Sequence, residues 1–410
     1  MNDKTRDFIG KNLDADVRQL ALKGCRDKEV DLDMALRQIA GRQTARRKLP
    51  SWAALDGILY PPHLNMEQCS SEQTARYKER VATKSLTPKN TLPTKLVDLT
   101  GGFGVDFALM SQAFDEAIYV ERDKELFDIT SENLKLLAPK ASCINGDGIE
   151  TLHALEHATM IFMDPARRDI HGARTYSIGD CTPNVLEIKE ELLQKADIVM
   201  LKLSPMLDWH KAISDLGETY IKEVHIVSVQ NECKELIVVM SRRESRDRRV
   251  RVVCTNILPD GSYELFQFSS LFTLHSSLIT PHSSLFTLHS SLFLYEPNAS
   301  IMKAGCFDEV AQAFNVSQLS PNSHLFTSDE LREDFPGRKF RIKTVSTMNK
   351  QELKNALRDI REANITVRNF PLSVAELRKK LKISEGGSEY IFATTLANGK
   401  HILLVTLPLR

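Results

Sequence analysis

Four acidic residues stand where apolar, strand-like runs of the sequence end. Asp98 ends KLVD, Glu121 ends AIYVE, Asp147 follows CIN, and Asp164 ends ATMIFMD. A single acid at the end of a strand is usually part of a solvated turn. Four of them in order, on successive predicted strands, indicate instead that the carboxylates serve one ligand site.

The stretch LVDLTGGFGVD, residues 96–106, predicts a strand, a glycine-rich turn and a helix that begins near Val105. Glycine is needed where the backbone adopts a positive φ or approaches a ligand closely. The dinucleotide pattern GxGxxG begins at Gly102 and Gly104 but requires a small residue where Phe107 stands, so this pattern fails. The stretch also lacks the Gly-Lys-Ser/Thr of a Walker phosphate loop.

The same residues fit S-adenosylmethionine. Asp98 can reach the ammonium group of this molecule, directly or through water, while amides of the turn can receive its carboxylate. Glu121 can accept hydrogen bonds from both ribose hydroxyls, and Asp147 can accept one from the adenine amino group. The predicted cofactor-binding residues are Asp98, Thr100, Gly102, Gly104, Asp106, Glu121 and Asp147.

The chain of 410 residues is long enough for several domains. Residues 1–90 space apolar residues by three and four and predict helices, with Gly24 and Gly41 as possible stops. From residue 95 to about 240, short apolar runs alternate with helical patterns, which predicts a doubly wound, mainly parallel sheet. Its last two runs, near 223–229 and 234–240, are too close for a helical crossover and predict an antiparallel hairpin.

The C-terminal part predicts two further hairpins, one turning at Asp260-Gly261 and one at Asn398-Gly399. Residues 296–314 predict a loop and then a helix, and Ser373 is the expected N-cap of a later helix. Residues 269–296 form a tandem repeat of period seven, SSLFTLH and its variants, which we interpret as an insertion that lengthens a loop or hairpin. The histidines at 275, 282 and 289 have no acidic or cysteine partner in the repeat, so repeat expansion explains them better than a metal site.

Composition narrows the class of protein. Formal net charge is zero, which excludes a globally basic nucleic-acid-binding protein but allows local basic patches. No window approaches the roughly 18 apolar residues of a membrane span, and the N-terminus has no apolar signal core. The seven cysteines include no CxxC, so we expect neither a structural metal nor disulfides, and a cytoplasmic location fits best.

The motifs VDLTGGFGVD, VERD, NGDG and MDPARRD resemble motifs I to IV of class I S-adenosylmethionine-dependent methyltransferases. The wider chain resembles one subfamily, the bacterial THUMP-like-domain methyltransferases, through KLPSW, EQCSSEQTARYK, YEPNASIMKAG and RNFPLSVAELRKKLKI. The resemblance covers nearly the whole chain except the repeat. One departure is Thr100, which replaces the usual first glycine of motif I.

The resemblance implies an α/β protein with a Rossmann-like class I methyltransferase core, an N-terminal helical region and C-terminal α+β domains. We expect the helical region at 1–90 and the methyltransferase domain at 91–240. A ferredoxin-like domain with the repeat insertion is expected at 241–345 and a THUMP-like domain at 346–410. THUMP domains are associated with RNA, so the resemblance implies RNA as a partner.

The stretch IFMDPARRD, residues 161–169, is the predicted catalytic segment. The resemblance implies that Asp164 and the Pro165 carbonyl accept hydrogen bonds from an exocyclic base amine. Related enzymes carry an aromatic residue where Arg167 stands, and a guanidinium plane can stack on a base or pair with a phosphate in its place. The alternative without a role in catalysis is that Arg167 or Arg168 forms a structural ion pair with Asp164 or a neighbouring acid.

The expected function is methyl transfer to a base amine of structured RNA, rRNA or tRNA. Basic clusters at 42–48, 242–251 and 378–382 flank the core and favour a polyanionic substrate. Methylation at carbon C5 would need a nucleophilic cysteine, for which Cys181 is a weak candidate, being more often a small core residue. The alternatives are a methyltransferase of small molecules or proteins, and a non-catalytic RNA-binding protein with a relic pocket.

Overall fold

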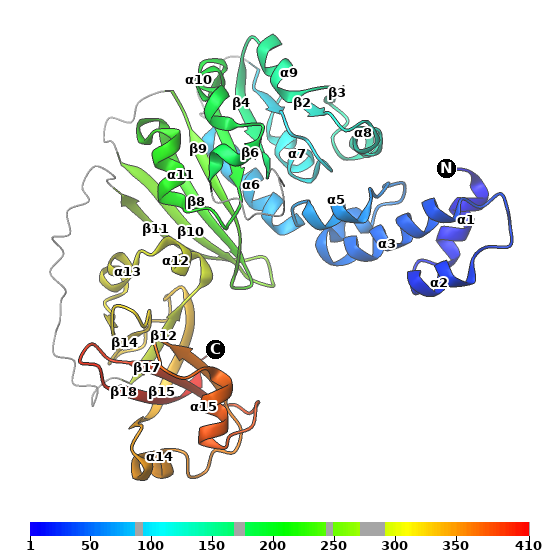
Figure 1. Cartoon of the computed structure of the whole chain (residues 1–410). Coiled ribbons are helices and arrows are strands. Elements are labelled where there is room, and N and C mark those ends of the chain that lie inside the picture. Colours follow the sequence, from blue (N-terminus) through cyan, green and yellow to red (C-terminus); the bar gives the residue numbers. More distant parts are fainter. Residues whose placement is uncertain (87–92, 168–176, 243–248, 271–291, 410) are drawn as a thin grey trace. The chain divides into compact units, whose positions relative to one another are not determined.

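The computed structural model describes residues 1–86, 93–167, 177–242, 249–270 and 292–409 (Figure 1). The chain forms two compact units. One comprises Met1–His225 with Glu235–Val250, and the other Ile226–Lys234 with Arg251–Arg410. None of the described helices is long and apolar enough to cross a membrane.

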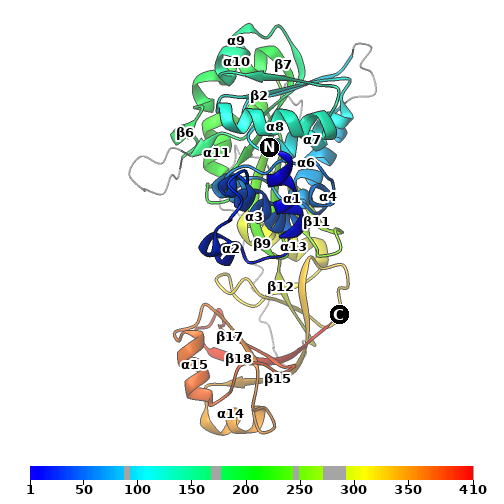
Figure 2. The same ribbon diagram turned by 90° about the vertical axis from the view of Figure 1, so that its right-hand side faces the viewer.

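Six helices open the first unit, and they are blue in Figures 1 and 2. Most begin at a polar residue whose side chain accepts a backbone N–H, as Asp31 and Ser71 do. Gly24 ends a helix with a φ of 67°, as predicted. Gly41 does not end one, because it lies inside a helix where Tyr60 packs so closely that a Cβ would meet it at 2.2 Å. The helices are α1 (Asp3–Lys11), α2 (Val17–Lys23), α3 (Leu32–Lys48), α4 (Pro50–Ala53), α5 (His63–Gln68) and α6 (Glu72–Ser85).

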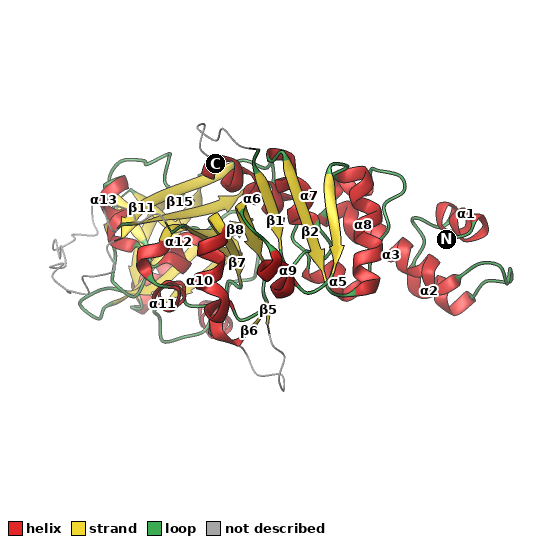
Figure 3. Cartoon of the chain, turned by 90° about the horizontal axis from the view of Figure 1, so that it is seen from above, coloured by secondary structure: helices red, strands yellow, loops and turns green. Residues whose placement is uncertain are grey.

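A mainly parallel sheet follows, as predicted, with the order β3-β2-β1-β4-β7 and helices beside it (Figure 3). The strands are β1 (Lys95–Asp98), β2 (Glu116–Glu121), β3 (Ala141–Asn145), β4 (Ala158–Met163) and β7 (Ala196–Leu203). The α-helices are α7 (Val105–Met110), α8 (Lys124–Leu137), α9 (Gly148–Ala154), α10 (Val185–Lys195) and α11 (Trp209–Leu216). Short 3-10 turns lie at Ser111–Ala113, Ile178–Asp180 and Glu218–Tyr220.

The predicted hairpin is confirmed as β8 (Ile221–Val229) and β9 (Glu232–Met240), neighbours in the sheet. Its two turn residues, Gln230 and Asn231, have φ values of 49° and 64°, which suit a tight hairpin. Strand β9 runs antiparallel to β7 and lies between β7 and β8.

A two-stranded ribbon was not expected from the sequence. Strand β5 (Ala166–Arg167) pairs antiparallel with β6 (Cys181–Thr182), so that Arg167 lies opposite Cys181. The predicted catalytic segment therefore continues from β4 into a second strand rather than into a simple turn.

The second unit begins with the tip of the β8–β9 hairpin, next to β10 (Val250–Ile257) and β11 (Tyr263–Ser270). The β10–β11 hairpin turns at Gly261, φ 83°, as predicted. The single helix expected within 296–314 is two helices, α12 (Ala299–Ala304) and α13 (Phe307–Phe314), because Gly305 adopts a left-handed φ of 71°. Of the tandem repeat, residues 271–291, with all three histidines, lie outside the described residues.

A seven-stranded sheet forms the rest of the second unit, in the order β13-β14-β12-β15-β18-β17-β16. Helices α14 (Lys350–Ala356) and α15 (Val374–Leu381) pack on one face through Leu353, Leu357 and Leu377 (Figures 1 and 2). Ser373 caps α15, as predicted. The strands are β12 (Phe293–Pro297), β13 (Ser317–Gln318), β14 (Phe326–Ser328), β15 (Gly337–Thr347), β16 (Asn364–Arg368), β17 (Tyr390–Thr395) and β18 (His401–Pro408).

Candidate active site

Each of the four strand-end acids lies at the carboxyl end of a strand of the parallel sheet. Asp98 and Glu121 are the last residues of β1 and β2, Asp147 follows β3, and Asp164 follows β4. These strands are neighbours in the order β3-β2-β1-β4, so their carboxyl ends meet at one edge. This edge is where open α/β sheets bind ligands.

The glycine turn between β1 and α7 is held by contacts that only glycine allows. A Cβ on Gly101 would come within 2.1 Å of the Tyr119 ring. Gly102 and Gly104 adopt left-handed φ values of 57° and 73°. The turn therefore requires glycine at all three positions.

The amides of this turn are less open to a ligand than the sequence suggested. Thr100, Gly101, Gly102 and Gly104 all donate their N–H within the protein. The acceptors are Asp98 Oδ1, Val120 O, Glu121 Oε2 and Gly101 O, at 3.0, 2.8, 2.8 and 2.9 Å. These four amides thus have acceptors within the protein, and the role of the turn amides toward the cofactor carboxylate stays a prediction.

Asp98 is almost completely buried, with 1% of its surface exposed. Burial raises the pKa of its carboxyl well above the usual value, the hydrogen bond from the Thr100 amide lowers it, and the nearby carboxylates of Asp106, Asp164 and Glu121 raise it. A cationic group next to Asp98 would offset the cost of burying a negative charge there and would favour the ionised carboxylate. The ammonium group of S-adenosylmethionine has the charge that such a position favours.

Glu121 and Asp147 are held in place by backbone donors. The oxygens of Glu121 accept the Gly102 and Asp123 amides at 2.8 and 2.7 Å. Asp147 caps α9, with Oδ1 accepting the amides of Ile149 and Glu150. A carboxylate has about four acceptor positions, so both side chains retain capacity for ribose hydroxyls or an adenine amine. These residues therefore fit S-adenosylmethionine.

We expect Gly148→Ala to weaken cofactor binding. A Cβ at Gly148 would lie 2.1 Å from the Leu99 carbonyl oxygen, so α9 and Asp147 must move away from the glycine turn. Calorimetry with S-adenosylmethionine should show an affinity at least about tenfold lower, since a shift of 1 Å can cost far more. Gly10→Ala, where a Cβ would meet nothing within 4 Å, is the control and should bind as the wild type does. Unchanged binding by Gly148→Ala would exclude Asp147 from the cofactor site.

Asp164 is tied to the glycine turn and to β7. Its amide donates to the Thr100 hydroxyl at 2.7 Å, and its Oδ2 accepts the Lys202 ammonium at 2.5 Å. Thr100 therefore holds the backbone at Asp164 in place, and its cofactor role stays a prediction. Pro165 is buried beside Asp164.

A buried ion network joins this segment to the N-terminal helices. Lys78 of α6 is fully buried and donates to both oxygens of Glu235 at 2.7 Å. Its ammonium is also 3.2 Å from Asp106, which accepts the Ser70 hydroxyl at 2.7 Å. Asp106 lies 3.9 Å from Lys202. Asp106 is thus enclosed by protein groups, and its predicted cofactor role remains untested.

Sequence reasoning missed Lys78, Lys202 and Glu235. A signal for each was present, because each is a charged residue within or at the start of a run of buried residues, and Glu235 directly precedes the buried apolar residues 236–240. Lys78 lies on the inward stripe of α6 with Thr74, Tyr77 and Val81, and Lys202 interrupts the apolar run VMLKL. Charged side chains are almost never fully buried unless they are paired.

Methylation at carbon C5 would need a reactive thiolate, and neither Cys181 nor Cys69, the two cysteines considered near Asp164, lies in an environment that favours one. Cys181 lies opposite Arg167 in the β5–β6 ribbon and is buried, closer to the catalytic segment than its sequence distance suggested. Burial raises the pKa of the Cys69 thiol to about 11, because the effect of burial is larger than the opposing effect of the Lys48 charge. The raised pKa disfavours the thiolate.

The substrate role of Arg167 stays a prediction, and Arg168 lies outside the described residues.

Comparisons with known protein families identify the C-terminal domains. Residues 293–336 match a ferredoxin-like domain, and residues 337–408 match a THUMP-like domain. No curated protein matches the chain.

Solved structures extend the comparison to the whole chain. A crystal structure named "putative methyltransferase", from Porphyromonas gingivalis W83, is 31% identical, covers 100% of both chains and superposes with a TM-score of 0.85. A S-adenosylmethionine-dependent methyltransferase from Agrobacterium tumefaciens is 17% identical with a TM-score of 0.30, covering 42% of this chain and 62% of its own. An rRNA methylase from Streptococcus thermophilus is 13% identical with a TM-score of 0.29, covering 40% and 93%.

The last two similarities are too low to carry an argument, whereas the first spans every element described above. Together with the two domain matches and the strand-end acids, it settles the family. The chain belongs to the class I S-adenosylmethionine-dependent methyltransferases of the bacterial THUMP-like-domain family.

Proposed function

We propose that this protein transfers a methyl group from S-adenosylmethionine to a base amine of structured RNA, rRNA or tRNA. The observation that carries the proposal is the position of Asp164. Its carboxylate is 40% exposed and follows β4, while Asp98 and Glu121 end the neighbouring strands β1 and β2. An amine acceptor therefore stands at the same sheet edge as the acids that fit the cofactor.

When bound, S-adenosylmethionine supplies an electrophilic methyl group on a sulfonium sulfur. The amine nitrogen forms the new N–C bond as the S–C bond breaks, and the electron pair of that bond stays on sulfur. The protein's part is to position the nucleophile in line and stabilise the changing charge. Asp164 and the Pro165 carbonyl would accept the amine hydrogens and aim the nitrogen lone pair at the methyl group. The nitrogen then loses one proton to water.

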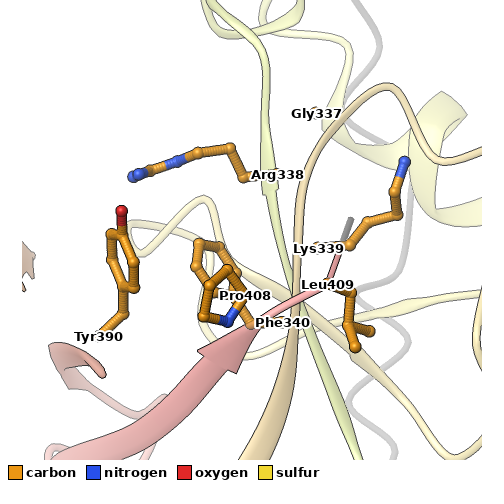
Figure 4. Close-up of a pocket in the computed structure, with 7 residues that line it drawn as sticks. All are labelled: Gly337, Arg338, Lys339, Phe340, Tyr390, Pro408 and Leu409. Carbon is orange, nitrogen blue, oxygen red and sulfur yellow. The ribbon is translucent and has the colours of Figure 1, made fainter. Parts of the chain in front are cut away.

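The THUMP-like domain supplies candidate RNA contacts. A shallow groove on its sheet is lined by Arg338, Lys339 and Tyr390, with the Arg338 guanidinium lying over the Tyr390 ring at 5.5 Å (Figure 4). Arginine and tyrosine are side chains on which bases stack. Arg338 also forms an ion pair with the buried Glu296, and this pair fixes the orientation of the guanidinium group.

The three basic clusters differ in what they can offer RNA. In the first, Arg42 pairs with Asp56, Arg46 pairs with Asp14, and Lys48 donates to two backbone carbonyls. The second falls mostly at 243–248, outside the described residues. In the third, Lys379, Lys380 and Lys382 are all exposed at the end of α15. The third cluster is the strongest candidate.

We expect the triple change of Lys379, Lys380 and Lys382 to Ala to weaken RNA binding and to reduce its salt dependence. Each lost phosphate contact should lower the slope of log affinity against log salt by about one. Filter binding of RNA over a range of salt concentrations measures this slope. The control changes three exposed lysines elsewhere, Lys11, Lys23 and Lys28, to Ala and should leave the slope unchanged. An equal loss in both variants would indicate only unspecific attraction.

The decisive test of the function compares modified nucleosides in RNA from wild-type and deletion cells by mass spectrometry. One methylated nucleoside should be missing from the deletion strain, and purified protein with labelled cofactor should restore it in vitro. If no RNA of the deletion strain accepts a methyl group, the proposal of an RNA substrate is wrong.

A further inference from the structure

Lys202 is a largely buried cation whose ammonium contacts Asp164, the proposed amine acceptor. Its side chain on β7 is 13% exposed, and its ammonium lies 2.5 Å from Asp164 Oδ2 and 3.9 Å from Asp106 Oδ2. Burial alone would lower the pKa of this ammonium, but the carboxylates of Asp164, Asp106 and Glu235 outweigh burial and raise it well above its usual value. Lys202 therefore keeps its charge and cannot act as a general base.

We propose that Lys202 is a positioning residue that keeps Asp164 ionised and binds Oδ2, which leaves Oδ1 as the side-chain acceptor for the substrate amine. This inference rests on the proposed function and refines it. An adjacent cation favours the carboxylate over the carboxylic acid. A carboxylic acid would donate a proton toward the amine lone pair, which must instead stay free to attack the methyl group.

Charged groups from several elements surround Asp164 and Lys202. Three other carboxyl groups lie close to Asp164 or to Lys202: Asp98 of β1, Asp106 of α7 and Glu235 of β9. Lys78 of α6 is already bound to Glu235 and Asp106, and Cys69 is the other titratable group near Lys202. Among the side chains that the structure describes, Lys202 is the cation paired with Asp164.

The network also fixes where Lys202 can point. Asp106 holds Lys202 from one side and is itself held by Lys78 and Ser70. The Asp164 backbone is held by the Thr100 hydroxyl. With both ends held, the 2.5 Å contact orients the carboxylate plane, and positioning of a reacting group is worth several orders of magnitude in rate.

The test uses full-length Lys202→Met and Lys202→Arg, with RNA from the deletion strain as substrate and labelled S-adenosylmethionine. We expect Lys202→Met to lower kcat by at least about 100-fold near neutral pH, in the range for loss of one preorganised charge. The acidic limb of its pH–rate profile should move to higher pH, because Asp164 now takes up a proton more readily. Lys202→Arg should return the limb toward its wild-type position. Lys211→Met, which removes an exposed lysine that pairs with Asp215, is the matched control and should behave as wild type.

A second readout needs no substrate. Carbon NMR of the labelled Asp164 carboxyl records the pH at which it takes up a proton, and this pH should be higher in Lys202→Met than in wild type. If wild-type protein methylates no RNA, the proposed function fails while the NMR titration still decides the role of Lys202. An identical titration in both proteins would overturn the inference. So would an equal loss of rate in Lys202→Met and Lys202→Arg at every pH, since that pattern indicates a packing role alone.

Discussion

Asp164→Ala is expected to abolish methyl transfer while leaving the affinity for S-adenosylmethionine mostly intact. The substitution removes the carboxylate that would accept the amine, so the nucleophile loses its alignment with the methyl group. The loss of rate should be at least about 100-fold, as for other positioned polar groups of active sites. Single-turnover transfer of labelled methyl groups to RNA measures the rate, and calorimetry measures the cofactor affinity.

Asp164→Asn is the sharper companion variant. It retains an oxygen acceptor but loses the charge that pairs with Lys202, so it should transfer more slowly than wild type and faster than Asp164→Ala. A large loss of cofactor affinity in Asp164→Ala would contradict the assignment, because Asp164 would then bind the cofactor. Both variants keep the backbone donor to Thr100, so the segment should remain in place.

Lys78→Met should produce the largest loss of stability among the changes considered. Lys78 is fully buried and neutralises Glu235 and Asp106, which are 3% and 8% exposed. Removing one member of a buried ion pair costs about 3–5 kcal/mol, because the remaining charge is left without compensation. Urea unfolding followed by tryptophan fluorescence reports this change selectively, since the chain has two tryptophans and both, Trp52 and Trp209, lie in the first unit.

The loss in Lys78→Met should depend on pH with a defined sign. Burial raises the pKa of Glu235, while Lys78 and Lys202 lower it. Without Lys78 the raised folded-state pKa dominates, so the variant binds a proton more tightly when folded and regains stability as pH falls. Lys84→Met, an exposed position of the same helix, is the control and should change stability by less than about 0.5 kcal/mol. A cost equally small for Lys78→Met would show that the network is not stabilising.

The ion network gives the N-terminal helices a role in the catalytic unit. Ser70 and Lys78 reach Asp106, and the Trp52 ring packs edge-on against Phe103 of the glycine turn at 5.1 Å. Residues 1–86 are therefore part of the same compact unit as the glycine turn and Asp106.

Much of this architecture follows from local sequence patterns. Apolar runs that end in an acid predicted β1, β2 and β4 with Asp98, Glu121 and Asp164 at their carboxyl ends, because strand burial and polar strand ends are local properties. The hairpins at Gly261 and Gly399 and the Ser373 cap also followed from short-range chemistry. The motifs were sufficient to predict the family, which the full-length relative confirmed.

Other features depend on residues far apart in sequence, and only the tertiary structure decided them. Gly41 looked like a helix stop but is needed inside α3 because Tyr60 packs against it. The antiparallel ribbon places Cys181 opposite Arg167 across fourteen residues of chain. Lys202 meets Asp164, and Lys78 meets Glu235, across separations of 38 and 157 residues. The sequence alone determined that a carboxylate, Asp164, follows β4. Which cation compensates its charge was decided by tertiary packing, because long-range electrostatic contacts leave no periodic pattern in the sequence.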